Sequence, residues 1–132
     1  MSHISAGAGL RIMGTGLDLV AISHNLGVDP TYTHKKGDRA NYKEKHNQDI
    51  WILNSPLDKK KNLEAHLRWL VKHVSAHYDY LRSLKPIAQI DVFCSSTSEG
   101  NQAGFSLTPK ALSLFVELGI NLELSLISLK SK

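Results

Sequence analysis

The chain is 132 residues long, with 42% hydrophobic and 21% charged residues and a net charge of +4 at pH 7. These values are typical of one globular domain that can bury a sizeable core, and they exclude a chain that is disordered throughout. Cys94 is the single cysteine, which excludes an intramolecular disulfide, and no apolar run approaches the ~20 residues of a membrane span. We therefore expect a soluble cytoplasmic protein with one domain over residues 1–132.

The N-terminal region predicts a strand followed by a helix. Apolar or small side chains alternate with others over residues 4–13, which is the period of a strand. Apolar side chains then recur at i, i+3 and i+7 over residues 19–26, as they do on one face of a helix. Thr15 or Asp18 can cap the start of this helix, and Gly27 can end it in the left-handed conformation.

A basic loop over residues 35–45 precedes a short predicted strand over residues 48–53. Successive side chains of a strand point to opposite faces of the sheet, so Ile50 and Ile52 face one way and Trp51 faces the other. We expect one of these two sets to pack in the core. The other set is then either exposed or covered by a partner.

The longest predicted element is a helix over residues 61–84, where apolar side chains follow helical spacing and Lys85-Pro86 marks the end. A strand over residues 88–94 comes next, because apolar and polar side chains alternate there. This alternation is typical of a sheet with one covered face, and it places Cys94 on that face.

The C-terminal region predicts a loop, a helix and a last strand. Residues 95–104 are rich in Ser, Thr, Gly and Asn, which indicates a loop, or the tip of a wide hairpin if residues 105–107 form a partner strand. Thr108 can cap the helix, and Gly119 can close it. Leucines then alternate over residues 122–126, which predicts the final strand.

This order of elements predicts an α+β fold. We expect a two-layer sandwich in which an antiparallel or mixed sheet of about four to five strands carries helices on one face. A ferredoxin-like arrangement fits the order best. The strands alternate and are not continuously apolar, which disfavours a doubly wound parallel fold.

Three histidines raise the question of a metal site. His73 and His77 lie at i and i+4 of the long predicted helix, a spacing that can place two imidazoles on one ion, and His66 lies one heptad earlier. No glutamate completes a metalloprotease pattern around them. We expect these histidines on the solvent side of the helix, with no metal and no other cofactor.

The sequence contains no catalytic signature, so we expect no catalytic residues and no enzyme activity. His34 with Asp38 could form an oriented base, but no nucleophile is tied to them. Cys94 is expected to be a packed small residue because it lies on a covered strand face. The serines and threonine of residues 95–98 lack the glycines of a nucleophile elbow.

The basic loop could bind nucleic acid through Lys35, Lys36 and Arg39. Acidic neighbours such as Asp38 and Glu44 dilute this charge, and no aromatic residues are interleaved with it. Weak nucleic-acid binding is therefore an alternative function, and we favour solvated loops as the explanation of the charge.

Protein binding is the function that we expect. Trp and Tyr supply large contact areas with a polar group, so Trp51 and Tyr32 are candidate interface residues, together with Lys36 and Asp38 of the loop. A non-catalytic interaction module, of immunity or inhibitory type, fits the small size best. A small metal-dependent hydrolase is a further alternative. We expect an unknown protein partner, no membrane, and a monomer or homodimer.

Several short motifs resemble an uncharacterised bacterial family, domain of unknown function 4279. The motifs are Leu26-Gly27-Val28-Asp29-Pro30-Thr31, Lys36-Gly37-Asp38, Trp51 with Ser55-Pro56-Leu57, and Thr108-Pro109 with Leu118-Gly119-Ile120. They cover nearly the whole chain. The resemblance implies a central strand before the long helix and a closing helix and strand, and it brings no established activity.

Overall fold

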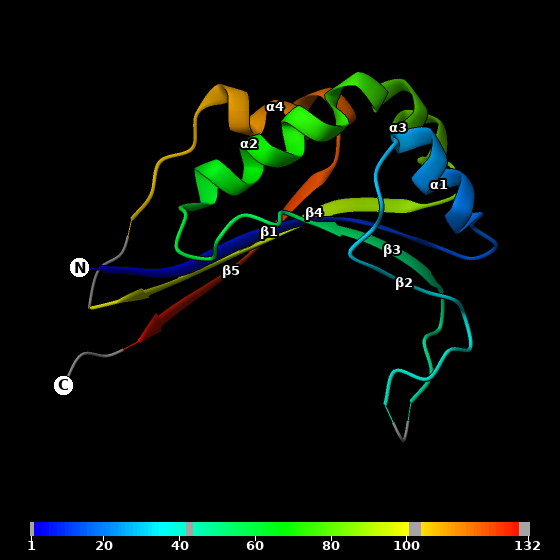
Figure 1. Cartoon of the computed structure of the whole chain (residues 1–132), viewed down its shortest axis with the longest axis horizontal. Helices are drawn as coiled ribbons and strands as arrows, with labels where there is room; N and C mark the ends of the chain where they lie inside the picture. The colour runs from blue at the N-terminus through cyan, green and yellow to red at the C-terminus, as the bar shows by residue number, and fades with distance from the viewer. Residues whose placement is uncertain (1, 42–43, 101–103, 130–132) are drawn as a thin grey trace.

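One mixed sheet organises the protein, in the strand order β2-β3-β1-β4-β5 (Figure 1). The computed structural model describes residues 2–41, 44–100 and 104–129. The strands are β1 Ser2–Gly14, β2 Tyr32–His34, β3 Asp49–Asn54, β4 Gln89–Glu99 and β5 Asn121–Leu129. The helices are α1 Leu19–Leu26, α2 Leu63–Val74, the 3-10 turn η1 Ser75–His77, α3 Tyr78–Leu84 and α4 Pro109–Leu118.

The strand order contains a ferredoxin-like core. Strand β1 pairs antiparallel with both β3 and β4, and β2 pairs antiparallel with β3. Helix α1 joins β1 to β2 across β3, and helix α2 joins β3 to β4 across β1, so the chain forms two split β-α-β units. Helix α4 then adds β5, which pairs parallel with β4. The predicted α+β sandwich with a mixed sheet is confirmed.

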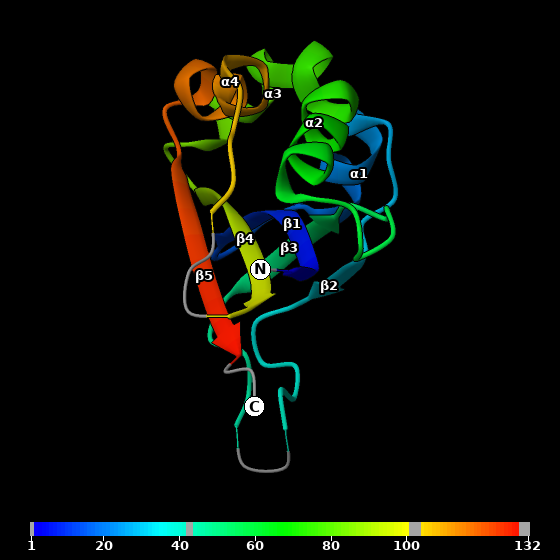
Figure 2. The same ribbon diagram turned by 90° about the vertical axis from the view of Figure 1, so that its left-hand side faces the viewer.

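All the helices lie on one face of the sheet, and the opposite face carries none (Figures 1 and 2). The core forms where the helices meet alternate strand positions, because one face of a half-covered sheet is apolar. Its fully buried side chains include Leu10, Ile12, Trp51, Leu67, Leu70, Val92, Cys94 and Leu114. Cys94 therefore packs as predicted. No helix in the described part of the chain has the length and apolar character that crossing a membrane requires.

The ends of α1 and α4 confirm the predicted caps. Asp18 accepts a hydrogen bond from the Ala21 amide at 3.0 Å, and Gly27 ends α1 with a φ of 67°. Thr108 accepts one from the Ala111 amide at 3.3 Å, and Gly119 ends α4 with a φ of 62°. Each capping side chain satisfies a free backbone N–H and contributes about 1 kcal/mol.

The predicted helix over residues 61–84 is interrupted, which corrects the prediction. Helix α2 ends at Val74, whose φ is −119°, and the turn η1 redirects the chain into α3. Helix α2 packs on β1 and on α4, and α3 also contacts α4. Val74 and Leu81 are both fully buried, because the change of direction brings Leu81 back to the core.

The predicted loop over residues 95–104 is also wrong in its first half. Strand β4 continues to Glu99, because its serines pair with β1 on one side and with β5 on the other. Residues 105–107 form no strand, and β5 takes the place of the predicted hairpin partner. Residues 101–103 of the predicted loop lie outside the described residues.

Candidate interaction surface

Residues 35–41 and 44–46 form an arm that projects away from the helices, beyond the short edge strand β2 (Figures 1 and 2). Across the arm, the Gly37 amide donates to the His46 carbonyl at 2.8 Å, and the His46 amide donates to the Asp38 carbonyl at 2.7 Å. The rings of His34 and His46 stack with centroids 4.1 Å apart. These contacts give the arm a defined base.

Asp49 fixes this base to the body of the domain. Its buried carboxylate accepts hydrogen bonds from the Lys36 amide at 2.8 Å and from the Leu17 amide at 2.9 Å. These N–H groups, that of Lys36 first, favour the charged form and hold the pKa of Asp49 below its ordinary value of 3.8. The arm is thus attached through a carboxylate that the sequence analysis did not single out.

The arm and β2 carry most of the residues predicted to bind a partner. Tyr32 in β2 is 49% exposed, and the side chains of Lys35, Lys36 and Asp38 are exposed beyond it. Arg39 is exposed as well, and its backbone forms an isolated antiparallel β-bridge with Lys45. Positions 42 and 43 of the predicted basic loop lie outside the described residues. The structure brings these residues to one edge of the sheet, and their role in binding stays a prediction.

Trp51 does not belong to this surface. Its side chain is fully buried on the helix face of β3, and its indole N–H donates to the Ser23 hydroxyl of α1 at 3.0 Å. The prediction that Trp51 forms an interface is therefore wrong. Of the two sets in this strand, Ile50 and Ile52 are the ones that face away from the helices, and both are half-buried.

A row of paired residues crosses the uncovered face of the sheet. The register sets Tyr32 opposite Ile52, Ile52 opposite Arg11, and Arg11 opposite Asp91. Residues directly opposite each other in neighbouring strands present their side chains on the same face. Phe93 lies two residues further along β4 on this face and is 40% exposed. We call this set the open face.

An ion pair occupies the middle of the open face. The Arg11 guanidinium donates two hydrogen bonds to the Asp91 carboxylate, at 2.7 and 2.8 Å, and Asp91 is only 2% exposed. The hydrogen bond with Asp91 raises the pKa of Arg11. The guanidinium carbon also lies 5.1 Å from the ring centroid of Phe93, within cation–π range. The two charges neutralise each other, so the centre of the open face is polar without a net charge.

Two glycines of β1 hollow the open face next to this ion pair. A cavity of about 460 Å³ is lined by Gly7, Gly9, Asn54 and Phe93 among others. A side chain at Gly9 would place its Cβ 2.0 Å from the Asn54 side-chain oxygen, so any larger residue there requires the Asn54 side chain to move. The hollow is thus built into the sequence of β1.

The structure places the histidines of the predicted long helix in different surroundings. His66 is 1% exposed and lies 2.8 Å from the Ser55 hydroxyl through Nδ1, so its predicted place on the solvent side is wrong. Burial lowers the pKa of His66 and keeps the ring neutral. His73 stacks on Trp69, with centroids 4.0 Å apart. Among the described residues, no group of three or more His, Cys, Asp or Glu side chains could hold a metal ion.

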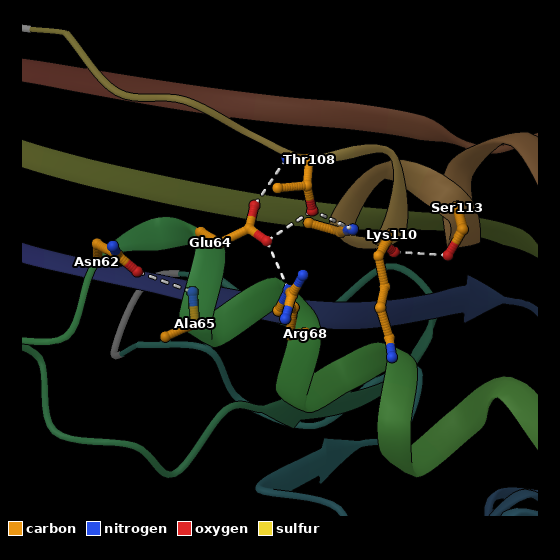
Figure 3. Close-up of polar contacts among 8 residues, drawn as sticks. Asn62, Glu64, Ala65, Arg68, Thr108, Lys110 and Ser113 are labelled. Carbon is orange, nitrogen blue, oxygen red and sulfur yellow. Dashed lines mark hydrogen bonds and ion pairs between the residues drawn. The ribbon is translucent and has the colours of Figure 1, made fainter.

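Glu64 connects the start of α4 to α2 (Figure 3). Its carboxylate accepts hydrogen bonds from the Thr108 amide at 2.8 Å, from the Thr108 hydroxyl at 2.7 Å and from Arg68 Nε at 2.6 Å. Burial raises the pKa of Glu64, but these donors outweigh burial and hold it below its ordinary value. Strand β5 follows α4 directly along the chain.

The far edge of the sheet, formed by β5, is long and apolar. Leu126 is 63% exposed, Ile127 48%, Leu129 47% and Leu124 39%. Glu123 is the single charged residue of this nine-residue strand, which has no proline. A cavity of about 640 Å³ lies beside its last residues, between the start of α2 and residues 104–108.

Comparison with known proteins gives one match. Residues 3–129 match the model of a family described as a domain of unknown function, DUF4279. The chain belongs to this family. No curated protein and no solved structure matches it. The family resemblance seen in the short motifs is thereby confirmed.

Within this member of the DUF4279 family, the residues that sequence reasoning missed lie on the open face and at its edge. Arg11, Asp91 and Phe93 come from alternate positions of β1 and β4. The sequence did contain a sign of these residues. Each places a charged or large side chain on the strand face opposite to the buried one, where small or polar side chains alternate with the apolar ones. What the sequence lacked was the register that makes Arg11 and Asp91 direct neighbours.

Proposed function

We propose that this domain is a non-catalytic protein-binding module, of inhibitory or immunity type, that binds a folded partner through its open face and the arm. The observation that carries the proposal is the exposure of Tyr32 and Phe93 on a sheet face that no helix covers. Exposed aromatic side chains on a flat face are typical of protein interfaces, where Tyr, Trp and Arg dominate the binding energy.

The ion pair makes the open face suitable for burial. Arg11 and Asp91 already satisfy each other, so a partner that covers them leaves no unpaired charge behind. The hollow at Gly7 and Gly9 next to them can receive a projecting side chain of the partner. Interface centres are depleted in free charges and rich in aromatic anchors, and the open face has the same composition.

The charge of the arm indicates the chemistry of the partner. Lys35 and Lys36 are exposed at the β2 border of the open face. Such cations at a rim increase the association rate with an acidic surface and select against basic partners. We therefore propose a folded protein that places an acidic patch next to an apolar one.

The test compares two double variants in capture from a lysate on immobilised, tag-free protein, with nuclease added. Tyr32→Ser with Phe93→Ser removes the aromatic anchors of the open face. Val20→Ser with Val116→Ser is the matched control, because both valines are 80% exposed and lie on α1 and α4. We expect wild type and control to retain one acidic protein that the open-face variant loses. The purified protein should show the same ranking by titration calorimetry.

Two results would contradict this proposal. Equal retention by all three proteins would place the binding surface elsewhere. Capture that disappears with nuclease, and with Lys35→Ala and Lys36→Ala, would favour the nucleic-acid alternative, whose binding should fall steeply with salt.

A further inference from the structure

Among the described residues, no strand pairs with the outer edge of β5. This strand is hydrogen-bonded to β4 on one side only and forms the outer border of the sheet (Figure 2). Alternate residues of such an edge strand present free N–H and C=O groups, which are a template for pairing with another strand. Glu123 of β5 lies opposite Phe93 of the open face, but the inference concerns the backbone edge of β5 and does not rest on the proposed function.

The sequence of β5 does nothing to prevent pairing. Natural edge strands are protected by short length, proline, bulges or several charges. Strand β5 has nine residues, no proline and one charge at Glu123, and its register with β4 has no shift. Four of its apolar side chains, Leu124, Leu126, Ile127 and Leu129, remain exposed.

We propose that β5 pairs antiparallel with β5 of a second copy of this chain, around a twofold axis at Ser125. The pairing joins the five strands of each copy into one continuous sheet. Ser125 is the midpoint of Asn121–Leu129, so this register uses all nine residues of both strands. A closed twofold contact also leaves no free β5 edge for further growth.

The side chains of β5 complement themselves in this register. On the helix side, Leu124 lies opposite Leu126 of the second copy, and Leu126 lies opposite Leu124 of the second copy. Cross-strand apolar pairs of this kind stabilise a sheet. These leucines are 39% and 63% exposed in the single chain, so pairing removes apolar surface from water.

The position of Glu123 favours the same register. With the axis at Ser125, Glu123 lies opposite Ile127 of the second copy, and the two Glu123 residues are separated by about 14 Å along the strands. That exceeds the Debye length of about 10 Å at 0.1 M salt, so the like charges are largely screened. An axis at Leu124 would bring the two carboxylates to about 7 Å and would leave residues 128 and 129 without partners.

A cysteine substitution tests the register directly. In an antiparallel pair, residues on the axis have Cα atoms about 4.5–5.5 Å apart, which is disulfide distance. Ser125→Cys should therefore cross-link two copies under mild oxidation. Ile127→Cys is the matched control, because it lies on the same strand face but about 14 Å from its symmetry mate. The native Cys94 is fully buried and should not interfere.

Sedimentation velocity tests the association without any cross-link. We expect wild type to populate a dimer as its concentration rises, and Leu126→Lys to raise the dissociation constant at least about tenfold by placing a charge in the leucine pair. Val116→Lys adds the same charge on α4, where valine is 80% exposed, and should leave the dimer intact. Circular dichroism verifies that each variant is folded.

The outcomes decide the proposal. Selective cross-linking of Ser125→Cys, together with a dimer that Leu126→Lys dissociates, would support it. A wild-type protein that stays monomeric over the whole concentration range would overturn it, and so would equal cross-linking of Ser125→Cys and Ile127→Cys. A dimer that Val116→Lys weakens as much as Leu126→Lys would also overturn it.

Discussion

The two edge strands of the sheet, β2 and β5, differ in how well they are protected against pairing with a strand of another molecule. At one edge, β2 has three residues, lies between Pro30 and a lysine-rich arm, and leads into a hairpin that Asp49 holds in place. At the other edge, β5 has nine residues with a single charge and is exposed along most of its length. Both edges expose backbone groups, but only β2 has the features that prevent pairing.

The packing of buried side chains also differs between the two edges of the sheet. Next to β2, the fully buried Trp51 and the carboxylate of Asp49 connect β3 to α1 and to the arm. The last residues of β5 run beside a cavity that separates them from the start of α2. Local stability should therefore fall across the sheet from β3 to the end of β5, since it follows the number of buried contacts.

The largest effect should come from Trp51. Trp51→Ala removes a fully buried indole and its hydrogen bond to Ser23, and it should lower the free energy of unfolding by about 3–5 kcal/mol. Leu126→Ala at the other edge should change it by less than about 0.5 kcal/mol in dilute protein, where the chain is monomeric. Urea denaturation measures both. Similar losses for the two variants would show that the edges are equally anchored.

Replacing Arg11 should cost more stability than replacing its ion-pair partner Asp91. Arg11→Ala leaves the Asp91 carboxylate buried without its cation, and it should cost about 3 kcal/mol. Asp91→Asn keeps one oxygen that accepts a hydrogen bond from Arg11, and the partly exposed Arg11 can also bind water. This substitution should therefore cost about 1 kcal/mol. Denaturation midpoints at neutral pH give both values. Equal costs would mean that Asp91 is hydrated in solution.

The anchor of the β2 edge should depend on pH. The pKa of Asp49 is lower in the folded state than the ordinary value of 3.8, so its stabilisation is present above 3.8 and is lost as pH falls through the folded pKa. The stability difference between wild type and Asp49→Asn should therefore shrink from neutral pH to below 3.8. Asp29→Asn removes an exposed carboxylate and controls for net charge. A difference that does not change with pH would contradict the anchoring role.

The smallest effect should come from the lysine side chains of the arm. Lys36→Ala keeps the backbone N–H that Asp49 accepts, so it should change the free energy of unfolding by less than about 0.5 kcal/mol. Lys36→Pro deletes that N–H and should cost about 1 kcal/mol or more. Thermal unfolding of the two variants side by side tests whether the backbone or the charge attaches the arm.

Local signals in the sequence predicted much of the fold. Asp18 and Gly27 mark the ends of α1, and Thr108 and Gly119 mark those of α4, because each of these residues satisfies a requirement of the adjacent backbone. The alternation around Val92 likewise predicted which face of β4 is covered. Features of this kind need no knowledge of distant parts of the chain.

The wrong predictions concern positions where contacts with distant parts of the chain determine the structure. Alternation separates Trp51 from Ile52 but does not say which one meets the helices. No glycine or proline marks the break after Val74, and the buried Leu81 shows that α3 returns to the core after the change of direction. The serines that follow Cys94 have the composition of a loop, and pairing with β1 and β5 makes them a strand. The open-face pair of Arg11 and Asp91 depends on register in the same way.

The central strand of the sheet is also the first of its five strands to be synthesised. Strand β1 needs β3 on one side and β4 on the other, so its hydrogen bonding is completed only after residue 99 has been synthesised. Until then the edge of β1 that pairs with β4 is open to other nascent chains. Its first half reads Ser-His-Ile-Ser-Ala-Gly-Ala-Gly, and glycine and alanine form strands poorly by themselves. The small residues that hollow the finished sheet should thus also lower the tendency of the unfinished chain to pair early.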